Sequence, residues 1–250
     1  MHTYEFSGKN LNSEDKKFIY FHFKPHMDRM VRLMEIESSD IVKPEESYIG
    51  REFMAYIGII SILVLLSGIH PHYFGTWFLE ILPVVFGLVA LLAFRKRFPV
   101  TPVLQRCLAA LAVLHLIGAH YSFSEVPLGY WLQNMLHLAR NPFDRISHFA
   151  QGVAAAVFFR ELLIRIAGVK ESKMLFFLSS SCTLAFIATY ELFEFAAWKI
   201  VLLNHTAVNV LGAQGDIWDT HWDMLLGLSG ALFALLLLAR IHDKSLLRCG

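Results

Sequence analysis

Long blocks of apolar residues, separated by short polar segments, dominate the sequence from about residue 54 onward. A transmembrane helix needs roughly 20 mostly apolar residues, and six segments come near that length. The predicted spans are Met54–Ile69, Phe78–Phe94, Val103–Tyr121, Ile146–Val169, Met174–Ile200 and Asp219–Ala239. The pattern therefore predicts an all-α, polytopic integral membrane protein, folded as a bundle of about six transmembrane helices.

The first 52 residues differ from the rest of the chain. They mix charges of both signs and contain no apolar run long enough for a signal peptide. Apolar residues recur with the spacing of one helix face at Met27, Met30, Val31 and Met34. We expect residues 1–52 to form a cytoplasmic or interfacial segment, with a partner-binding helix as the alternative. Residues 53–240 would form the membrane domain and residues 241–250 a cytoplasmic tail.

The composition supports a membrane protein and excludes several other classes. Hydrophobic residues make up 56% of the chain, charged residues 17%, and the mean hydropathy is +0.49, which is more apolar than a typical soluble domain. A net charge of +1 provides no basic face for nucleic acid. The three cysteines, Cys107, Cys182 and Cys249, share no C-x-x-C spacing, which argues against a disulfide framework.

The distribution of Lys and Arg predicts how the helices are oriented. Positive charges gather after the second span, after the fourth span and in the tail, at Arg95, Lys96, Arg97, Arg106, Arg165, Lys170, Lys173, Arg240, Lys244 and Arg248. Of the intervening connections, residues 70–77 and 201–218 have none, and residues 122–145 have two, Arg140 and Arg145. By the positive-inside rule, both termini should lie in the cytoplasm of a multi-pass inner-membrane protein.

Ionisable residues inside the predicted spans are the main functional signal. Each costs about 3 kcal/mol at membrane depth on insertion scales, so each needs a partner or a role. With the predicted orientation, four helices bring polar groups to one depth near the outer surface. They are His120 in the third span, Asp144, His148 and Gln151 in the fourth, Glu191 and Glu194 in the fifth, and Asp216, Asp219, His221 and Asp223 at the sixth.

The spacing of these residues favours one shared site. Residues three, four or seven apart lie on one face of a helix. That spacing joins Asp144, His148 and Gln151, then Glu191 and Glu194, and then Asp216, Asp219 and Asp223. His221 falls on a different face of its helix and is the weaker candidate. Carboxylates crowded in a low dielectric must hold protons, meet cations or bind a metal.

Carboxylate and imidazole groups on facing helices are common ligands of bundle-core metal sites. We predict a divalent metal ion (Zn²⁺, Mn²⁺, Fe²⁺ or Mg²⁺) held by some of His148, Glu191, Glu194, Asp219 and Asp223. An acid outside the ligand set, Asp144 or Asp216, would act as general base. His120, Gln151 and His221 complete the polar cluster. The sequence contains no H-E-x-x-H motif, so charge crowding alone carries this prediction.

Structural roles are open for several of these residues. Asp144 follows Asn141 and Pro142 at the start of a predicted helix, where an acid can cap free N–H groups, and Asp216 or Asp219 could cap the sixth helix. Glu191 and Glu194 could instead form a structural ion network with Arg145 or Lys199. His120 could be an ordinary interfacial histidine.

Five short sequence strings carry a resemblance to a known family. They are G-A-H-Y (118–121), S-E-V-P (124–127), D-R-I-S-H-F-A-Q-G (144–152), E-L-F-E (191–194) and G-A-Q-G-D-I-W-D-T-H-W-D-M (212–224). In this order they resemble the YjdF-type inner-membrane family, a domain of unknown function, over about residues 51–240. The D-R-x-x-H-F string followed by later acids is more loosely similar to VanZ-like membrane proteins. Both resemblances imply a polytopic helical membrane fold.

Three functions follow from these observations. The first is a metal-dependent hydrolase or transferase whose site meets a membrane lipid or lipid-linked substrate near the outer leaflet. The second is a non-enzymatic scaffold or accessory factor with a structural polar cluster. The third is an ion-coupled transporter, which would place its acids near the midplane within reach of both sides. The sequence leaves the oligomeric state open.

Overall fold

A computed structural model describes residues 43–203 and 213–248 of the chain. The chain forms two units, residues 1–47 and 48–250, and the description below concerns the second. Most of the predicted N-terminal segment, including its apolar face at 27–34, lies outside the described residues. In the described residues every regular element is a helix, so the predicted all-α fold is confirmed.

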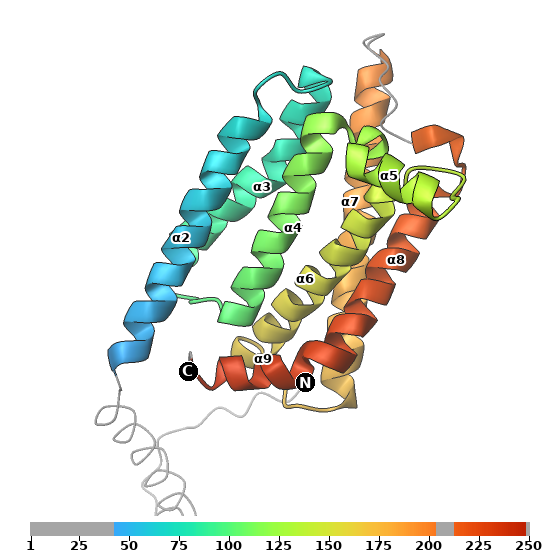
Figure 1. Cartoon of the computed structure of the whole chain (residues 1–250). Helices are drawn as coiled ribbons and strands as arrows, with labels where there is room; N and C mark the ends of the chain where they lie inside the picture. The colour runs from blue at the N-terminus through green and yellow to red at the C-terminus, as the bar shows by residue number, and fades with distance from the viewer. Residues whose placement is uncertain (1–42, 204–212, 249–250) are drawn as a thin grey trace, which may run out of the picture. The chain divides into compact units, whose positions relative to one another are not determined.

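Figure 1 shows the long helices running alternately up and down. The elements are α2 (Lys43–Ser67), α3 (Phe74–Phe94), α4 (Pro102–Tyr121), η1 (Phe123–Glu125), α5 (Pro127–Met135), α6 (Phe143–Arg165), α7 (Lys173–Leu203), η2 (Ala213–Gly215), α8 (Asp219–Phe233), η3 (Ala234–Leu238) and α9 (Ala239–Leu246). We call the end where α4 finishes and α6 and α8 begin the upper end, and the opposite end the lower end.

Five stretches within these helices are long and apolar enough to cross a membrane: Gly50–Ser67, Phe74–Phe94, Pro102–Tyr121, Lys173–Ala197 and Asp219–Leu246. The helix that matches the remaining predicted span is α6. It has 23 residues, which is long enough at 1.5 Å per residue, but its composition is too polar. The polytopic membrane fold with about six long helices is therefore confirmed, with one helix of a different kind.

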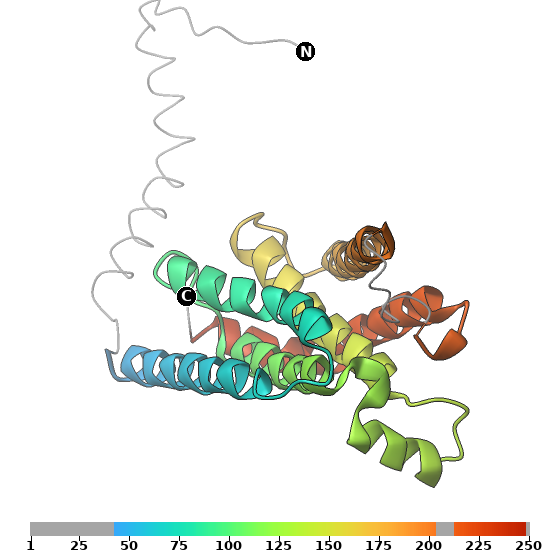
Figure 2. The same cartoon turned by 90° about the horizontal axis from the view of Figure 1, so that it is seen from above.

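α6 occupies the centre of the bundle. It packs against α4, α7 and α8, and Figure 2 shows these three helices arranged around it. Ala154, Ala156, Arg160 and Glu161 on α6 are all buried. Because its neighbours shield α6 from lipid, the helix can carry charges that a lipid-facing span could not carry at low cost.

Glycines allow α6 and α8 to approach each other at backbone distance. A Cβ atom on Gly152 would lie 1.8 Å from the carbonyl oxygen of Gly227, and one on Gly230 would lie 2.1 Å from that of Phe149. No larger residue fits at these two positions without moving a helix. Small residues at such a contact are typical of membrane helix pairs. This contact fixes the register between α6 and α8.

Several helix boundaries differ from the predicted spans, and the differences at α6 and at the sixth span bear on the site and the tail. α6 begins at Phe143 rather than Ile146 and ends at Arg165 rather than Val169, because Gly168 takes a left-handed backbone with φ of +65°. The predicted sixth span divides into α8, the π-helical η3 and α9. Figure 1 shows α9 turning across the lower end of the bundle, so part of the predicted tail forms a helix that packs on the protein.

A buried polar network joins α9 to α6 at the lower end. Glu161 is fully buried and accepts hydrogen bonds from the Thr101 hydroxyl at 2.6 Å and from Arg165 at 2.7 Å. His242 Nε2 lies 3.1 Å from Glu161 Oε2, the oxygen that Thr101 also binds. Arg160 contacts the other ring nitrogen, His242 Nδ1, at 3.0 Å. Since Arg160 can only donate, Nδ1 accepts and Nε2 carries the proton given to Glu161. Both Glu161 oxygens and both His242 nitrogens therefore have partners.

We expect Glu161→Ala to destabilise the protein by about 3–5 kcal/mol, because removing one partner leaves buried charges and donors uncompensated. The melting temperature in detergent should fall by about 10 °C. His221→Ala is the matched control, since His221 is exposed and should melt like wild type. Equal melting temperatures for Glu161→Ala and wild type would contradict a stabilising role for this network.

Candidate functional site

The start of α6 is held by side chains that precede it. Asn141 Oδ1 accepts from the backbone N–H of Phe143 at 3.1 Å, and Asn141 Nδ2 donates to the Val126 carbonyl at 3.0 Å. Gln214 Oε1 accepts from the backbone N–H of Asn141 at 2.8 Å, and Gln214 Nε2 donates to the Asn141 carbonyl oxygen at 3.1 Å. Asn141 therefore performs the capping role that the sequence left open for Asp144. Asp144 lies in the first turn of α6, where its carboxylate is free for another use.

Three side chains from α6 and α8 converge at the upper end of the bundle. Asp144, His148 and Asp223 each present one ligand atom, and these atoms all lie within 4.8 Å of one another. Around a single ion with bonds of about 2.1 Å, two ligand atoms lie at most about 4.2 Å apart. Small side-chain rotations would close the difference, so the three residues can hold a divalent ion.

Glu191 joins this cluster from α7. Its Oε1 atom lies 3.7 Å from His148 Nε2, and Asp144 Oδ1 lies 3.6 Å from the same nitrogen. His148 Nε2 therefore lies near two carboxylates. His148, Glu191 and Asp223 are 6%, 4% and 3% exposed. The three helices thus place two acids and an imidazole in a setting almost closed to solvent, together with the less buried Asp144.

Several atoms of this cluster have no hydrogen-bond partner among the described residues: His148 Nδ1, Glu191 Oε1 and Asp223 Oδ1. Nearly all buried polar atoms in proteins are satisfied, and exceptions need an explanation. Glu191 Oε1, which lies 3.7 Å from His148 Nε2, is therefore open to a further bond, as is Asp223 Oδ1. His148 Nδ1 lies on the edge of the ring opposite to Nε2 and needs a different partner.

Two arginines form the rim of the cluster. Arg140 Nη1 contacts Asp219 Oδ1 at 2.5 Å and Asp216 Oδ2 at 3.2 Å, and Arg145 Nη2 contacts Asp216 Oδ2 at 2.8 Å. The pKa of Asp216 lies below its usual range, first because the Trp218 backbone N–H donates to it and then because both arginines lie beside it. The acids at the start of α8 are therefore ion-paired, and Arg145 binds Asp216 rather than Glu191 or Glu194.

A second polar group, not chosen from the sequence, faces the cluster from α3 and α4. His115 Nε2 lies 2.8 Å from the Glu80 carbonyl oxygen and 3.4 Å from its carboxylate. Tyr190 on α7 donates to the same carboxylate at 3.4 Å, and its ring lies edge-on to His148. The sequence signal for this group was Glu80, an acid inside the otherwise apolar α3. The group connects the α3–α4 pair to the site.

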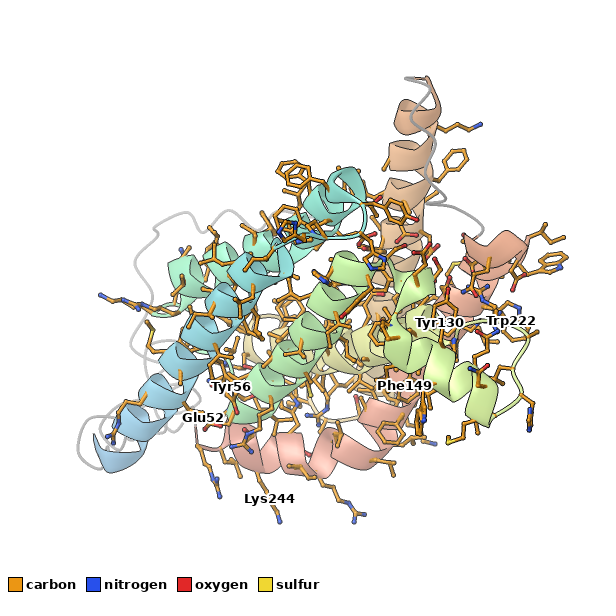
Figure 3. All side chains as sticks on the ribbon, turned by 45° about the horizontal axis from the view of Figure 1, so that its top comes forward. Glu52, Tyr56, Tyr130, Phe149, Trp222 and Lys244 are labelled. Atoms are coloured by element: carbon orange, nitrogen blue, oxygen red, sulfur yellow. The ribbon has the colours of Figure 1, made fainter. Side chains whose placement is uncertain are left out.

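A cavity of about 270 Å³ leads to this polar region. Apolar side chains from α2, α3 and α4 line most of it, among them Ile57, Ile60, Leu88 and Leu108. Tyr56, labelled in Figure 3, also lines it. At the upper end the lining changes to polar groups, namely His115, Asp144, His148, Gln151, Tyr190 and Glu194. The cavity is thus mostly apolar along its length, with Gln105 near its lower end, and polar at its upper end.

The remaining predicted residues lie at different distances from the cluster. Gln151 and Glu194 line the cavity beside it. Asp219 and Asp216 lie in the rim. His120 lies elsewhere, with Nδ1 2.9 Å from the Ser67 carbonyl oxygen, and His221 is exposed against the Trp218 ring. Site roles for these residues stay predictions.

Comparisons with known proteins agree with the membrane fold. The sequence matches the family described as "Predicted membrane protein (DUF2238)" over residues 53–244. It is also 38% identical, over 191 residues, to "Inner membrane protein YjdF" of Escherichia coli (strain K12), covering 76% of this chain and 90% of that protein. The chain belongs to the DUF2238 family. No solved structure matches it.

Membership of the DUF2238 family confirms the predicted YjdF-type resemblance and a multi-pass membrane protein. The name of its relative supports an inner-membrane location. Neither the family description nor the relative's name states a reaction, a metal or a partner.

The rim gives a prediction on pH dependence. Because folding lowers the pKa of Asp216, its contribution to stability is present above the unfolded pKa of about 3.9 and is lost as the pH falls through the lower folded value. Asp216→Asn should melt below wild type at pH 7, and the melting temperatures of the two proteins should converge once the pH is below the folded pKa of Asp216. The measurement is a detergent melting series against pH.

Glu171→Gln serves as the control for this series. The Glu171 side chain is 77% exposed and lies 3.9 Å from Arg160, at the outer limit of an ion pair, so this variant should follow wild type at every pH. If the difference in melting temperature between Asp216→Asn and wild type stays constant from pH 7 to the lowest pH measured, the ion pairing of Asp216 in the rim would be contradicted.

Proposed function

We propose that this protein is a metal-dependent membrane hydrolase or transferase acting on a lipid or lipid-linked substrate. The observation that carries the proposal is the meeting of an apolar cavity with the buried cluster of Asp144, His148 and Asp223. Pockets that are mostly apolar, with a few convergent polar groups at one end, are typical of sites for amphipathic small molecules.

The donor set suits a divalent ion that accepts nitrogen and oxygen ligands, such as Zn²⁺, Mn²⁺ or Fe²⁺, or Mg²⁺ if oxygens dominate. A bound ion would lower the pKa of a coordinated water from about 15.7 toward 7 and polarise a substrate oxygen. Asp144, His148 and Asp223 would hold it. An ion would also offset the repulsion among the acids gathered around His148.

Glu191 is the general base in this proposal. Its Oε1 atom lies beside His148 and has no hydrogen-bond partner in the described part of the chain. The carboxylate would take a proton from the attacking water, whose oxygen forms a bond to the phosphorus or acyl carbon of the substrate. As the ester bond breaks, the departing alkoxide would receive that proton. The roles of Asp144 and Glu191 are therefore exchanged relative to the sequence prediction.

The cavity would hold the hydrocarbon part of the substrate. Its apolar lining from α2, α3 and α4 would offer the hydrocarbon chain of the lipid the same environment as the bilayer. The head group would then lie at Asp144 and His148. Tyr190 and Glu194, which line the same end, would contact the head group. A lipid in this position reaches the cluster without leaving the membrane.

Metal content tests the proposal. Full-length protein purified in detergent, loaded with Zn²⁺ or Mn²⁺ and freed of excess metal, should retain about one ion per chain by elemental analysis, because the site offers one ligand set. His148→Ala/Asp223→Ala should retain less than about one tenth of an ion. His221→Ala is the matched control, an exposed imidazole on α8, and should retain the wild-type amount.

Equal metal content in wild type and the double variant, with equal melting temperatures, would reject the metal site and leave the scaffold and transporter hypotheses.

If the metal site holds, Glu191→Gln should bind metal normally and abolish release of head groups from vesicles of phosphatidylethanolamine and phosphatidylglycerol. Wild-type hydrolysis that persists in Glu191→Gln would reject the assignment of the base.

We further propose that the upper end faces away from the cytoplasm, as the positions of Lys and Arg indicate. With this orientation the C-terminus is cytoplasmic. A fluorescent protein fused to the C-terminus should fluoresce in cells, and alkaline phosphatase fused there should be inactive. Phosphatase inserted after Gly75, an exposed position in the first turn of α3, should be active. The reverse pattern would invert the orientation.

A further inference from the structure

Arg140 binds the acids at the start of α8 through a single guanidinium nitrogen. Both of its hydrogen bonds, to Asp219 and Asp216, leave from Nη1. Nε and Nη2 are buried and have no hydrogen-bond partner among the residues that the structure describes. These two nitrogens share one edge of the planar group, the geometry that binds two oxygens of a phosphate or carboxylate side by side.

Arg145 has a similar arrangement in the first turn of α6. Its Nη2 donates to Asp216 at 2.8 Å, and its guanidinium lies over the Trp222 ring at 5.3 Å from the centroid. Figure 3 shows Trp222 at the same side of the molecule as Tyr130. Arg145 Nε is buried and likewise has no partner in the described residues. Two neighbouring arginines thus hold three buried donor nitrogens in need of acceptors.

The surrounding electrostatics favours an anion at these donors. α6 and α8 both begin at this end of the bundle, and the N-terminus of a helix carries a partial positive charge with free N–H groups. Arg140 also interacts electrostatically with Asp144, one of the proposed metal ligands. A substrate anion approaching the acids of the cluster would be repelled without such a counter-charge.

We propose that Arg140 and Arg145 bind the phosphate group of the substrate, which makes the substrate a phosphate-bearing lipid rather than a neutral ester. This inference rests on the proposed function. Phosphate has enough oxygens for the Nε and Nη2 edge of Arg140, for Nε of Arg145 and for the metal. The hydrocarbon chain of the same molecule would occupy the apolar cavity. Free phosphate shares this chemistry and is the other source of the ligand.

Binding of two matched lipids tests the proposal. We would use metal-loaded, full-length protein in detergent with short-chain phosphatidic acid, diacylglycerol of the same chains, and inorganic phosphate. Wild type should bind phosphatidic acid at least about tenfold more tightly than diacylglycerol. Arg140→Lys keeps the charge but loses the two-nitrogen edge, so its affinity for phosphatidic acid should fall about tenfold. Its diacylglycerol affinity and metal content should not change.

Arg145→Lys is the second variant, in case Arg140→Lys does not fold, and should weaken phosphatidic acid binding in the same direction. Arg106→Lys is the matched control, an exposed arginine at the lower end paired with Glu52, and should behave as wild type. If inorganic phosphate competes with phosphatidic acid and binds with equal affinity, the result would support the anion site and identify the free phosphate ion as its ligand.

Equal wild-type affinities for the two lipids, or wild-type binding of phosphatidic acid by both folded lysine variants, would overturn the proposal. The two failures are distinguishable, because metal content reports on His148 and Asp223 and lipid selectivity reports on the arginines. Protein that retains metal but shows no preference for phosphatidic acid would leave the proposed function standing without this inference.

Discussion

The cost of charge at membrane depth constrains this structure more than any other physical term. α6 carries Arg160 and Glu161 near one end and Asp144 and His148 near the other, which would be expensive in contact with lipid. The bundle resolves this by placing α6 inside, against α4, α7 and α8. The more apolar helices surround it and face lipid instead. The charges of α6 then become available for a structural network at the lower end and a candidate site at the upper end.

The close contact between α6 and α8 connects the fold to the site. Gly152 and Gly230 let the two backbones touch, and that approach brings His148 and Asp223 to a common point. The two ends of α6 are built differently. At the lower end Glu161 has a partner for each oxygen, Arg165 for Oε1 and Thr101 and His242 for Oε2, whereas at the upper end His148 and Asp223 retain atoms without partners in the described residues. A satisfied network stabilises, and an incomplete one is available for binding.

The cavity joins two parts of the molecule that contribute different chemistry. α2, α3 and α4 supply most of its apolar lining, while α6 and α7 supply most of the acidic and imidazole groups at its end. Tyr190 and Glu80 meet across this boundary and hold the two parts in register. An amphipathic molecule needs both environments at once, and neither part offers them alone. The arginine rim adds the positive charge that the acidic cluster lacks.

The sequence by itself determined the membrane class, the approximate helices and the set of polar residues at one depth, because hydrophobic length and i, i+4 spacing are local properties. Asp144, His148 and Asp223 were all named from spacing. Tertiary structure decided which of them meet. Spacing could not show that Asn141 caps α6, that Asp219 pairs with Arg140, or that Glu80 and His115 face the site from other helices. Those facts depend on how helices rotate and pack against one another, and packing joins residues that are far apart in the chain.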